Sequence, residues 1–289
     1  MTYFNEPEFA EQFGESRRAT AAESASRIIE FAGIQPGQCV VDLCCGPGLV
    51  SQHLAERAGA TGELIGVDAS AAMIDLARAN VTAANARFIV GDAYDLPSLV
   101  PHTIDHVVAT SAWQNFLPDK ERAVRAVRTV LKPSGRFTFD VRLRPGAAPQ
   151  TVKGSDRSRF RERVIKLVRK EYPGLTLDEE HDFGFLGVQH TERILYTSED
   201  VDNDIVFLEA NGFGLVGRHD VPRSQEGPGC YSRQRWRVDY WLSRVVPGLP
   251  AEGRAKILDR VADEMRSRRP AEPRRGLTAY VVMEMGPGE

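Results

Sequence analysis

Short apolar runs alternate with longer amphipathic stretches through the first half of this chain. Each run is rich in β-branched residues, as buried strands are, and each stretch between them has helical spacing. Alternating strands and helices give a parallel sheet with helices on both faces. The pattern therefore predicts a Rossmann-like, doubly wound α/β fold. The expected strands are residues 39–43, 63–68, 86–90, 104–109 and 136–141.

The N-terminal residues have a different pattern. Four aromatic residues lie among charges between positions 3 and 18, which predicts a short helical arm over residues 1–18, separate from a domain at 19–289. Such an arm either packs on the domain or closes over a ligand. A second helix is expected from Thr20 to Ala32, because Gly33 is a typical helix stop.

The first strand leads into a glycine-rich turn, Cys44–Gly48, and then into a helix. This geometry brings backbone N–H groups close to a nucleotide-like ligand. A dinucleotide site needs G-x-G-x-x-G, but Ser51 stands where the third glycine would be. Asp42 would repel a pyrophosphate and suits the ammonium and sulfonium of S-adenosylmethionine. A plain strand-to-helix turn is the remaining alternative.

Acids also follow the second and third strands. Asp68 lies about twenty residues past the glycines, where a carboxylate can bind ribose hydroxyls. Its alternative role is to place a charge at a helix N-terminus, but Ser70 already suits the N-cap position. Asp92 can accept a hydrogen bond from an adenine amine while the next backbone N–H donates to the ring.

Composition excludes several classes of protein. The 289 residues have a net charge of −3, so nothing global indicates a nucleic-acid partner or an anionic membrane. No window is apolar enough to span a bilayer, and the acidic N-terminus is not a signal peptide. The four cysteines form neither a disulfide framework nor a zinc pattern, so no metal site is expected. A cytoplasmic location is the default expectation.

Four motifs together resemble the core of class I S-adenosylmethionine-dependent methyltransferases: VVDLCCGPG at 40–48, GVDAS at 66–70, VGDAYDLP at 90–97 and VLKPSGRF at 130–137. The resemblance implies a mostly parallel, seven-stranded sheet with an antiparallel last strand at 278–285. The chain differs from the usual family pattern at Cys44, where a glycine is common. Trp113 would lie near the sulfonium, although a core anchor is an equal alternative. The cofactor-binding residues that the resemblance implies are Asp42, Cys44, Gly46, Gly48, Asp68, Ala69, Met73, Asp92, Ala93, Ser111 and Trp113.

Two long segments interrupt the second half of the pattern, at about 142–197 and 222–275. Long insertions in a compact domain are usually lids or binding loops, so both are expected to form a substrate cap. Between them, a helix from Ser198 to Asn211, with Ser198 as N-cap, precedes a sixth strand at 214–221.

The substrate and catalytic residues are expected in these insertions. Arginines and aromatics gather after the sixth strand, which suits an anionic or partly anionic small molecule. For any single arginine, a place on a solvated charged face is the favoured alternative. The substrate-binding candidates are Tyr231, Arg233, Arg235 and Trp236, and the acid–base candidates are Glu171, Tyr172 and His190.

These observations predict methyl transfer from S-adenosylmethionine to a small organic acceptor. One alternative is carbon methylation of a prenyl diphosphate or similar anion, and Mg²⁺ is expected only in that case. Others are a protein or RNA methyltransferase and a non-catalytic cofactor-binding protein. The sequence determines neither the acceptor atom nor the oligomeric state.

Overall fold

The computed structural model describes residues 3–101, 103–143, 156–178, 196–222, 235–266 and 277–287. It divides into two compact units, each described here by itself. The first contains Phe4–Pro145, Tyr196–Pro222 and Gly276–Glu289, and the second contains Met1–Tyr3, Gly146–Leu195 and Arg223–Arg275. The second unit thus corresponds to the two segments that the sequence marks as insertions.

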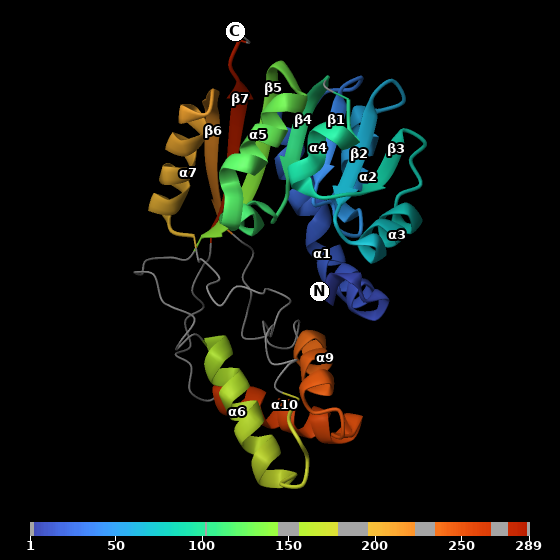
Figure 1. The fold of residues 1–289 in the computed structure, drawn as a ribbon, viewed down its shortest axis with the longest axis vertical. Coiled ribbons are helices and arrows are strands. Elements are labelled where there is room, and N and C mark those ends of the chain that lie inside the picture. Colours follow the sequence, from blue (N-terminus) through green and yellow to red (C-terminus); the bar gives the residue numbers. More distant parts are fainter. Residues whose placement is uncertain are drawn as a thin grey trace. The chain divides into compact units, whose positions relative to one another are not determined.

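The first unit is built on one seven-stranded sheet in the order β3-β2-β1-β4-β5-β7-β6 (Figure 1). β1 to β5 run parallel, and β7 pairs antiparallel with both β5 and β6. The doubly wound sheet and its antiparallel last strand are therefore confirmed. The strands are β1 Cys39–Leu43, β2 Glu63–Asp68, β3 Ala86–Val90, β4 Ile104–Ala109, β5 Leu131–Leu143, β6 Phe213–Pro222 and β7 Leu277–Met285.

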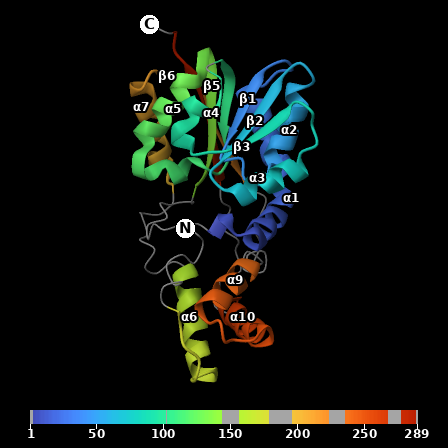
Figure 2. The ribbon, with the colours of Figure 1, turned by 45° about the vertical axis from the view of Figure 1, so that its right-hand side comes forward.

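Helices cover both faces of this sheet, because each face buries its own apolar cluster. One cluster joins the sheet to α1 (Pro7–Ala32), α2 (Leu49–Ala58) and α3 (Ala71–Asn80). The other joins it to α4 (Leu96–Leu99), α5 (Lys120–Val130) and α7 (Ser198–Ala210). Figure 2 shows α2 and α3 beside β2 and β3, with α5 and α7 toward the other end of the sheet. Within the described chain, no helix is both long and apolar enough to cross a membrane.

The N-terminal arm is not separate from the next helix, which corrects the expected boundary at residue 19. After a short 3-10 turn, η1 (Tyr3–Asn5), one continuous helix, α1, runs to Ala32. Gly33 then ends it in the left-handed conformation, φ 71°, with its N–H bound to the carbonyls of Ile29 and Glu30. The small and apolar residues along α1, which include Phe9, Ala21 and Ile28, are buried, so nothing in its packing breaks the helix.

Two further elements differ from expectation. β5 begins at Leu131, five residues before the expected start at Arg136, because Leu131 already pairs with Ile104 of β4. The register then shifts across Lys132–Gly135 before Arg136 pairs with His106. α7 is capped by Thr197 and not by Ser198. The Thr197 side chain accepts from the N–H of Asp200, whose carboxylate accepts from the N–H of Thr197. This reciprocal capping box satisfies two helix-end N–H groups at once, which Ser198 cannot do from inside the helix.

The second unit, in its described part, consists of three helices with their own apolar core. They are α6 (Asp156–Glu171), α9 (Arg235–Val245) and α10 (Ala251–Arg266). Val164 and Val168 from α6, Leu242 from α9 and Val261 from α10 are almost completely buried. Segments on either side of β6 in the sequence therefore share one hydrophobic cluster.

The capping box predicts a difference between two neighbouring substitutions. Thr197→Ala removes the side-chain acceptor for the Asp200 N–H and should lower the free energy of unfolding by about 1 kcal/mol. Ser198→Ala is the matched control, because the Ser198 hydroxyl accepts a hydrogen bond from the partly buried Arg218, which Asp202 and Asp220 also hold, and it caps no helix. Urea unfolding of both variants measures the difference. A larger loss for Ser198→Ala would contradict the assigned cap.

Candidate active site

The five parallel strands end at one edge of the sheet, and acidic residues gather there. Asp42 lies in β1, Asp68 ends β2, and Asp92 follows β3. β1 and β4 are neighbours in the sheet although β2 and β3 lie between them in the sequence. Chain order therefore reverses between β1 and β4, and ligands of doubly wound sheets bind in the crevice at that point.

The turn between β1 and α2 needs unusual backbone conformations. Cys44, Gly46 and Gly48 have φ values of 59°, 55° and 76°. At Gly48 a Cβ would lie 3.0 Å from the Cα and Cβ of Ala77 and from Cγ2 of Val81, so α3 packs directly on the turn. At Gly46 a Cβ would meet nothing within 4 Å. One glycine allows close packing, and the other leaves the outer side of the turn open.

Asp42 is a buried carboxyl group held by one neighbour. Its side chain is 1% exposed, and its Oδ2 accepts a 2.6 Å hydrogen bond from the Ser51 hydroxyl. Burial raises the pKa of Asp42 to about 7; the Ser51 hydrogen bond opposes this shift and the charge of Asp68 adds to it. Ser51 occupies the position of the third glycine in the dinucleotide fingerprint. Here its hydroxyl instead donates to Asp42, the carboxylate that would repel a pyrophosphate.

Asp68 connects the glycine turn to the start of α3. One carboxylate oxygen accepts from the Gly46 N–H and the other from the Ser70 N–H, both at 2.9 Å. Burial raises the pKa of Asp68, and these two N–H groups oppose the shift. Ser70 itself caps α3, since its hydroxyl accepts from the Met73 N–H at 3.2 Å. The expectation that Ser70 is the N-cap of α3 is confirmed.

The remaining predicted cofactor residues surround these two acids. Asp92 is exposed and accepts from the Tyr94 N–H at 2.9 Å, so it caps the short η2 turn (Ala93–Asp95). Ala93 and Met73 are buried, whereas Ala69 is exposed. All of them flank the carboxyl ends of β2 and β3 in sequence.

Cys44 lies among the three carboxylates. Burial raises the pKa of its thiol, and the charges of Asp68, Asp42 and Asp92 raise it further. The adjacent Cys45 thiol is shifted upward for the same reasons, with burial first. Both thiols are therefore protonated at neutral pH and are poor nucleophiles and metal ligands. No metal-ligating cluster occurs among the residues that the structure describes.

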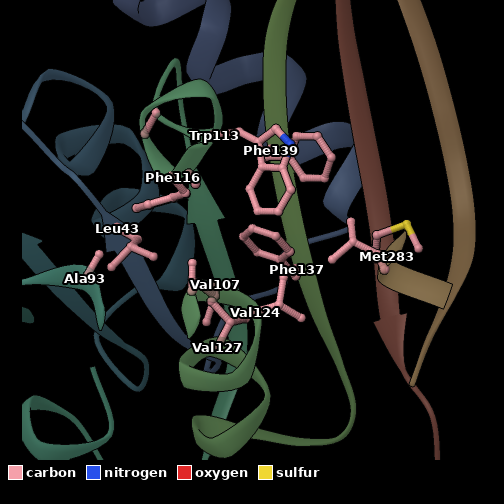
Figure 3. Close-up of a cluster of buried hydrophobic side chains, with 14 of the residues drawn as sticks. Leu43, Ala93, Val107, Trp113, Phe116, Val124, Val127, Phe137, Phe139 and Met283 are labelled. Atoms are coloured by element: carbon pink, nitrogen blue, oxygen red, sulfur yellow. The ribbon is translucent and has the colours of Figure 1, made fainter. Parts of the chain in front are cut away.

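Trp113 is a core residue, which was the alternative left open by the sequence. Its ring is 0% exposed and lies against Phe139, with the ring centroids 4.6 Å apart (Figure 3). Its indole N–H donates to Asp204 at 2.6 Å, and Lys120 pairs with the same carboxylate. Its contacts are those of a core anchor between β5 and the following helices, which corrects the expectation that this ring lies open beside the cofactor.

Two of the acid–base candidates, Glu171 and Tyr172, contact other residues of the second unit. Glu171 pairs with Arg260 of α10 at 2.5 Å. The Tyr172 hydroxyl packs so close to Gly253 that a Cβ there would be 2.7 Å away. These contacts give both residues a structural role in joining α6 to α10. Of the other candidates, Trp236 lies half-buried on α9 and Arg235 begins that helix. His190, Tyr231 and Arg233 lie outside the described residues.

Comparison with known proteins now adds to this geometry. Residues 40–135 match a family model described as a methyltransferase domain. An arsenite methyltransferase from Halobacterium salinarum is 33% identical over 139 residues, 43% of this chain and 35% of the relative. A demethylmenaquinone methyltransferase from Staphylococcus aureus is 31% identical over 110 residues, 38% of this chain and 45% of the relative. The chain thus spans less than half the length of these relatives.

The matched residues are those that form the glycine turn and the acidic strand ends. Residues 40–135 are therefore similar to a methyltransferase domain, which supports the resemblance to class I S-adenosylmethionine-dependent methyltransferases. The YcgJ protein from Bacillus subtilis has the same fold, with a TM-score of 0.50 and 22% identity over 93% of this chain and 100% of that one.

One acid near the same edge of the sheet was not identified from the sequence. Asp140 lies near the carboxyl end of β5, is 3% exposed, and accepts from the Ser111 N–H at 2.5 Å. The signal was present, since Asp140 follows the expected strand residues Phe137–Phe139 as Asp68 follows those of its own strand. Ser111 has φ 53°, and no sequence pattern announces a left-handed serine.

The two glycines of the turn should respond differently to the same substitution. Gly46→Ala and Gly48→Ala both place a Cβ at positive φ, which costs roughly 1–2 kcal/mol. Gly48→Ala adds the steric cost of overpacking against Ala77 and Val81, about 1–3 kcal/mol more. Equilibrium unfolding in urea should therefore show the larger loss for Gly48→Ala. Equal losses would mean that α3 does not pack tightly on the turn.

Proposed function

We propose that this protein transfers a methyl group from S-adenosylmethionine to a small organic acceptor. The observation that carries the proposal is the position of Asp68. Its carboxylate holds the Gly46 N–H while the outer side of Gly46 remains open. A ligand can therefore approach the backbone of the turn beside a carboxylate that is already fixed in place.

The residues of this edge fit the parts of the cofactor. Asp42 would face the ammonium of the methionine part, and the open side of Gly46 would allow that part to approach the backbone. Asp68 would accept from the ribose hydroxyls, because each of its oxygens receives one N–H in the structure and retains a lone pair. Asp92 and the Ala93 N–H would meet the adenine. S-adenosylmethionine would supply an electrophilic methyl group on a sulfonium.

The chain's own contribution is electrostatic and positional. Burial raises the pKa of Asp42, and the nearby charge of Asp68 raises it further. A cation bound between such carboxylates is favoured, because it relieves their repulsion and the cost of burying their charge. This edge of the sheet therefore selects a cationic ligand over a pyrophosphate.

The proposed acceptor is a small molecule. Both curated relatives reported above carry names of enzymes that act on small molecules. Carbon methylation of a diphosphate with Mg²⁺ lacks support in the described residues, which contain no metal-ligating cluster.

Cofactor affinity should depend on pH through Asp42. With a pKa of about 7, this carboxyl is protonated below that pH in the free protein. A bound ammonium favours the carboxylate, so binding below pH 7 must release a proton, and affinity falls as the pH drops. Calorimetry should show affinity for S-adenosylmethionine falling by roughly tenfold from about pH 7.5 to about pH 6.

Two variants control this measurement. Asp42→Asn cannot titrate and should bind more weakly with a flat pH profile over the same range. Asp75→Asn removes an exposed acid of α3 and should keep the wild-type profile. A wild-type profile for Asp42→Asn would remove Asp42 from the site.

The function itself is tested with the full chain and S-adenosylmethionine labelled in its methyl group. The protein is added to an extract of the source cells, with and without Mg²⁺, and products are separated by size and by anion exchange. Label in a small product without Mg²⁺ dependence supports the proposal, and Asp68→Ala should weaken cofactor binding by about 1–3 kcal/mol and slow the labelling. Label in protein or RNA, or a small anionic product that requires Mg²⁺, would favour the rival acceptors.

A further inference from the structure

Asp140 is a buried acid at the functional edge of the sheet that the proposed function does not yet use. It pairs with Tyr280 of β7 in the antiparallel ladder, and its side chain is 3% exposed. Thr138, two residues earlier on β5, shares its face and pairs with Val108 of β4. Asp42 pairs with that same Val108 from the other side, so Asp42 and Asp140 project from one face of the sheet.

The partner of Asp140 is a strained residue. The Ser111 N–H donates to Oδ1 of Asp140 at 2.5 Å, and Ser111 has φ 53°. A left-handed conformation costs a non-glycine residue roughly 1–2 kcal/mol. A second hydrogen bond lies within the turn after β4, where the Gln114 side chain donates to the Ser111 carbonyl at 2.6 Å. Backbone strain of this kind persists only where the surroundings hold it, and it gathers at functional sites.

The strained turn at Ser111 lies at the edge of the sheet where the ligand is proposed to bind. Ser111 follows β4, and the glycine turn follows β1, which is the neighbour of β4 in the sheet. The two turns therefore form the two walls of the crevice at which chain order reverses. The glycine wall is held by Asp68 through the Gly46 N–H, and the β4 wall is held by Asp140 through the Ser111 N–H.

Other charged groups also act on Asp140. Burial raises its pKa, whereas the Ser111 N–H and the charges of Arg142 on β5 and Arg17 on α1 lower it. On β7, the carboxyl of Asp140 in turn raises the pKa of Tyr280, whose shift is due first to burial. A buried acceptor of a backbone N–H is expensive to remove, because the N–H is left without a partner.

We propose that Asp140 is a positioning residue for methyl transfer: its carboxyl oxygen holds Ser111 in the left-handed conformation and thereby fixes the β4 wall of the crevice. This inference rests on the proposed function. It assigns Asp140 no proton transfer. An oxygen that accepts from Ser111 is the only requirement, and a side chain with such an oxygen but no charge meets it.

The test compares Asp140→Ala, Asp140→Asn and Thr138→Val in the full chain. Asp140→Ala should slow transfer of labelled methyl into the small-molecule fraction of the extract by roughly 10- to 100-fold. Its affinity for S-adenosylhomocysteine should fall by less than the rate does, because Ser111 is only one of the expected cofactor-binding residues. Asp140→Asn keeps an accepting oxygen and should retain most of the rate. Thr138→Val is the matched control on the same strand and face, because Thr138 is fully buried and its hydroxyl has no partner among the described residues.

A second substitution separates positioning from general stability. Glycine adopts the left-handed conformation without strain, so Ser111→Gly introduced into Asp140→Ala should recover the rate by roughly fivefold. A defect of β5 packing would not respond to a change at Ser111. Thermal melting of the two single variants and the double variant should also give non-additive shifts, since the residues are in direct contact.

Three results would overturn the inference. They are a wild-type rate for Asp140→Ala, an Asp140→Asn rate as low as that of Asp140→Ala, and additive melting shifts with no recovery by Ser111→Gly. If Asp140→Ala does not fold, the Asp140→Asn rate and the melting of Ser111→Gly/Asp140→Asn decide in its place. If the wild-type protein labels no small molecule, the proposed function fails and the assigned role falls with it. The melting shifts then still report whether the contact exists.

Discussion

The left-handed backbone of the Cys44–Gly48 turn is the constraint on which this site depends. Three of its five residues have positive φ, and the turn has to pass between a buried strand and a helix within that length. α3 packs against Gly48 from one side, and Asp68 holds the Gly46 N–H. Because the turn is fixed by packing and by a carboxylate, its open side is available to a ligand without further ordering of the chain.

The price of this arrangement is the burial of carboxyl groups. Asp42, Asp68 and Asp140 all have raised pKa values, with burial as the first cause in each. Each is stabilised by a donor from a neighbouring turn or helix: the Ser51 hydroxyl, the Gly46 and Ser70 N–H groups, and the Ser111 N–H. The acids therefore serve two purposes, since the hydrogen bonds that make their burial tolerable also fix the turns around the crevice.

Trp113 shows why a motif position can be found in the sequence while its role cannot. An aromatic residue after the fourth strand can face either the ligand or the core. Its orientation is decided by partners distant in the chain: Phe139 on β5, Asp204 on α7 and Lys120 on α5. Glu171 is similar, because its partner Arg260 lies in the other insertion. The residue type and its position in a single sequence do not show which contacts an acid or an aromatic residue makes in the folded chain.

The sequence by itself determined the strand order along the chain, the glycine turn and the acids that end β1 to β3, because strand periodicity, glycine conformation and strand-end position are local properties. It also marked the insertions by the break in that pattern. Tertiary structure alone decided that α1 is continuous, that Thr197 and not Ser198 caps α7, and that Asp140 meets a left-handed Ser111. The Asp140–Ser111 contact depends on groups far apart in the chain being brought within hydrogen-bond distance. The continuity of α1 and the choice of cap for α7 depend on which of several locally acceptable conformations the folded chain keeps.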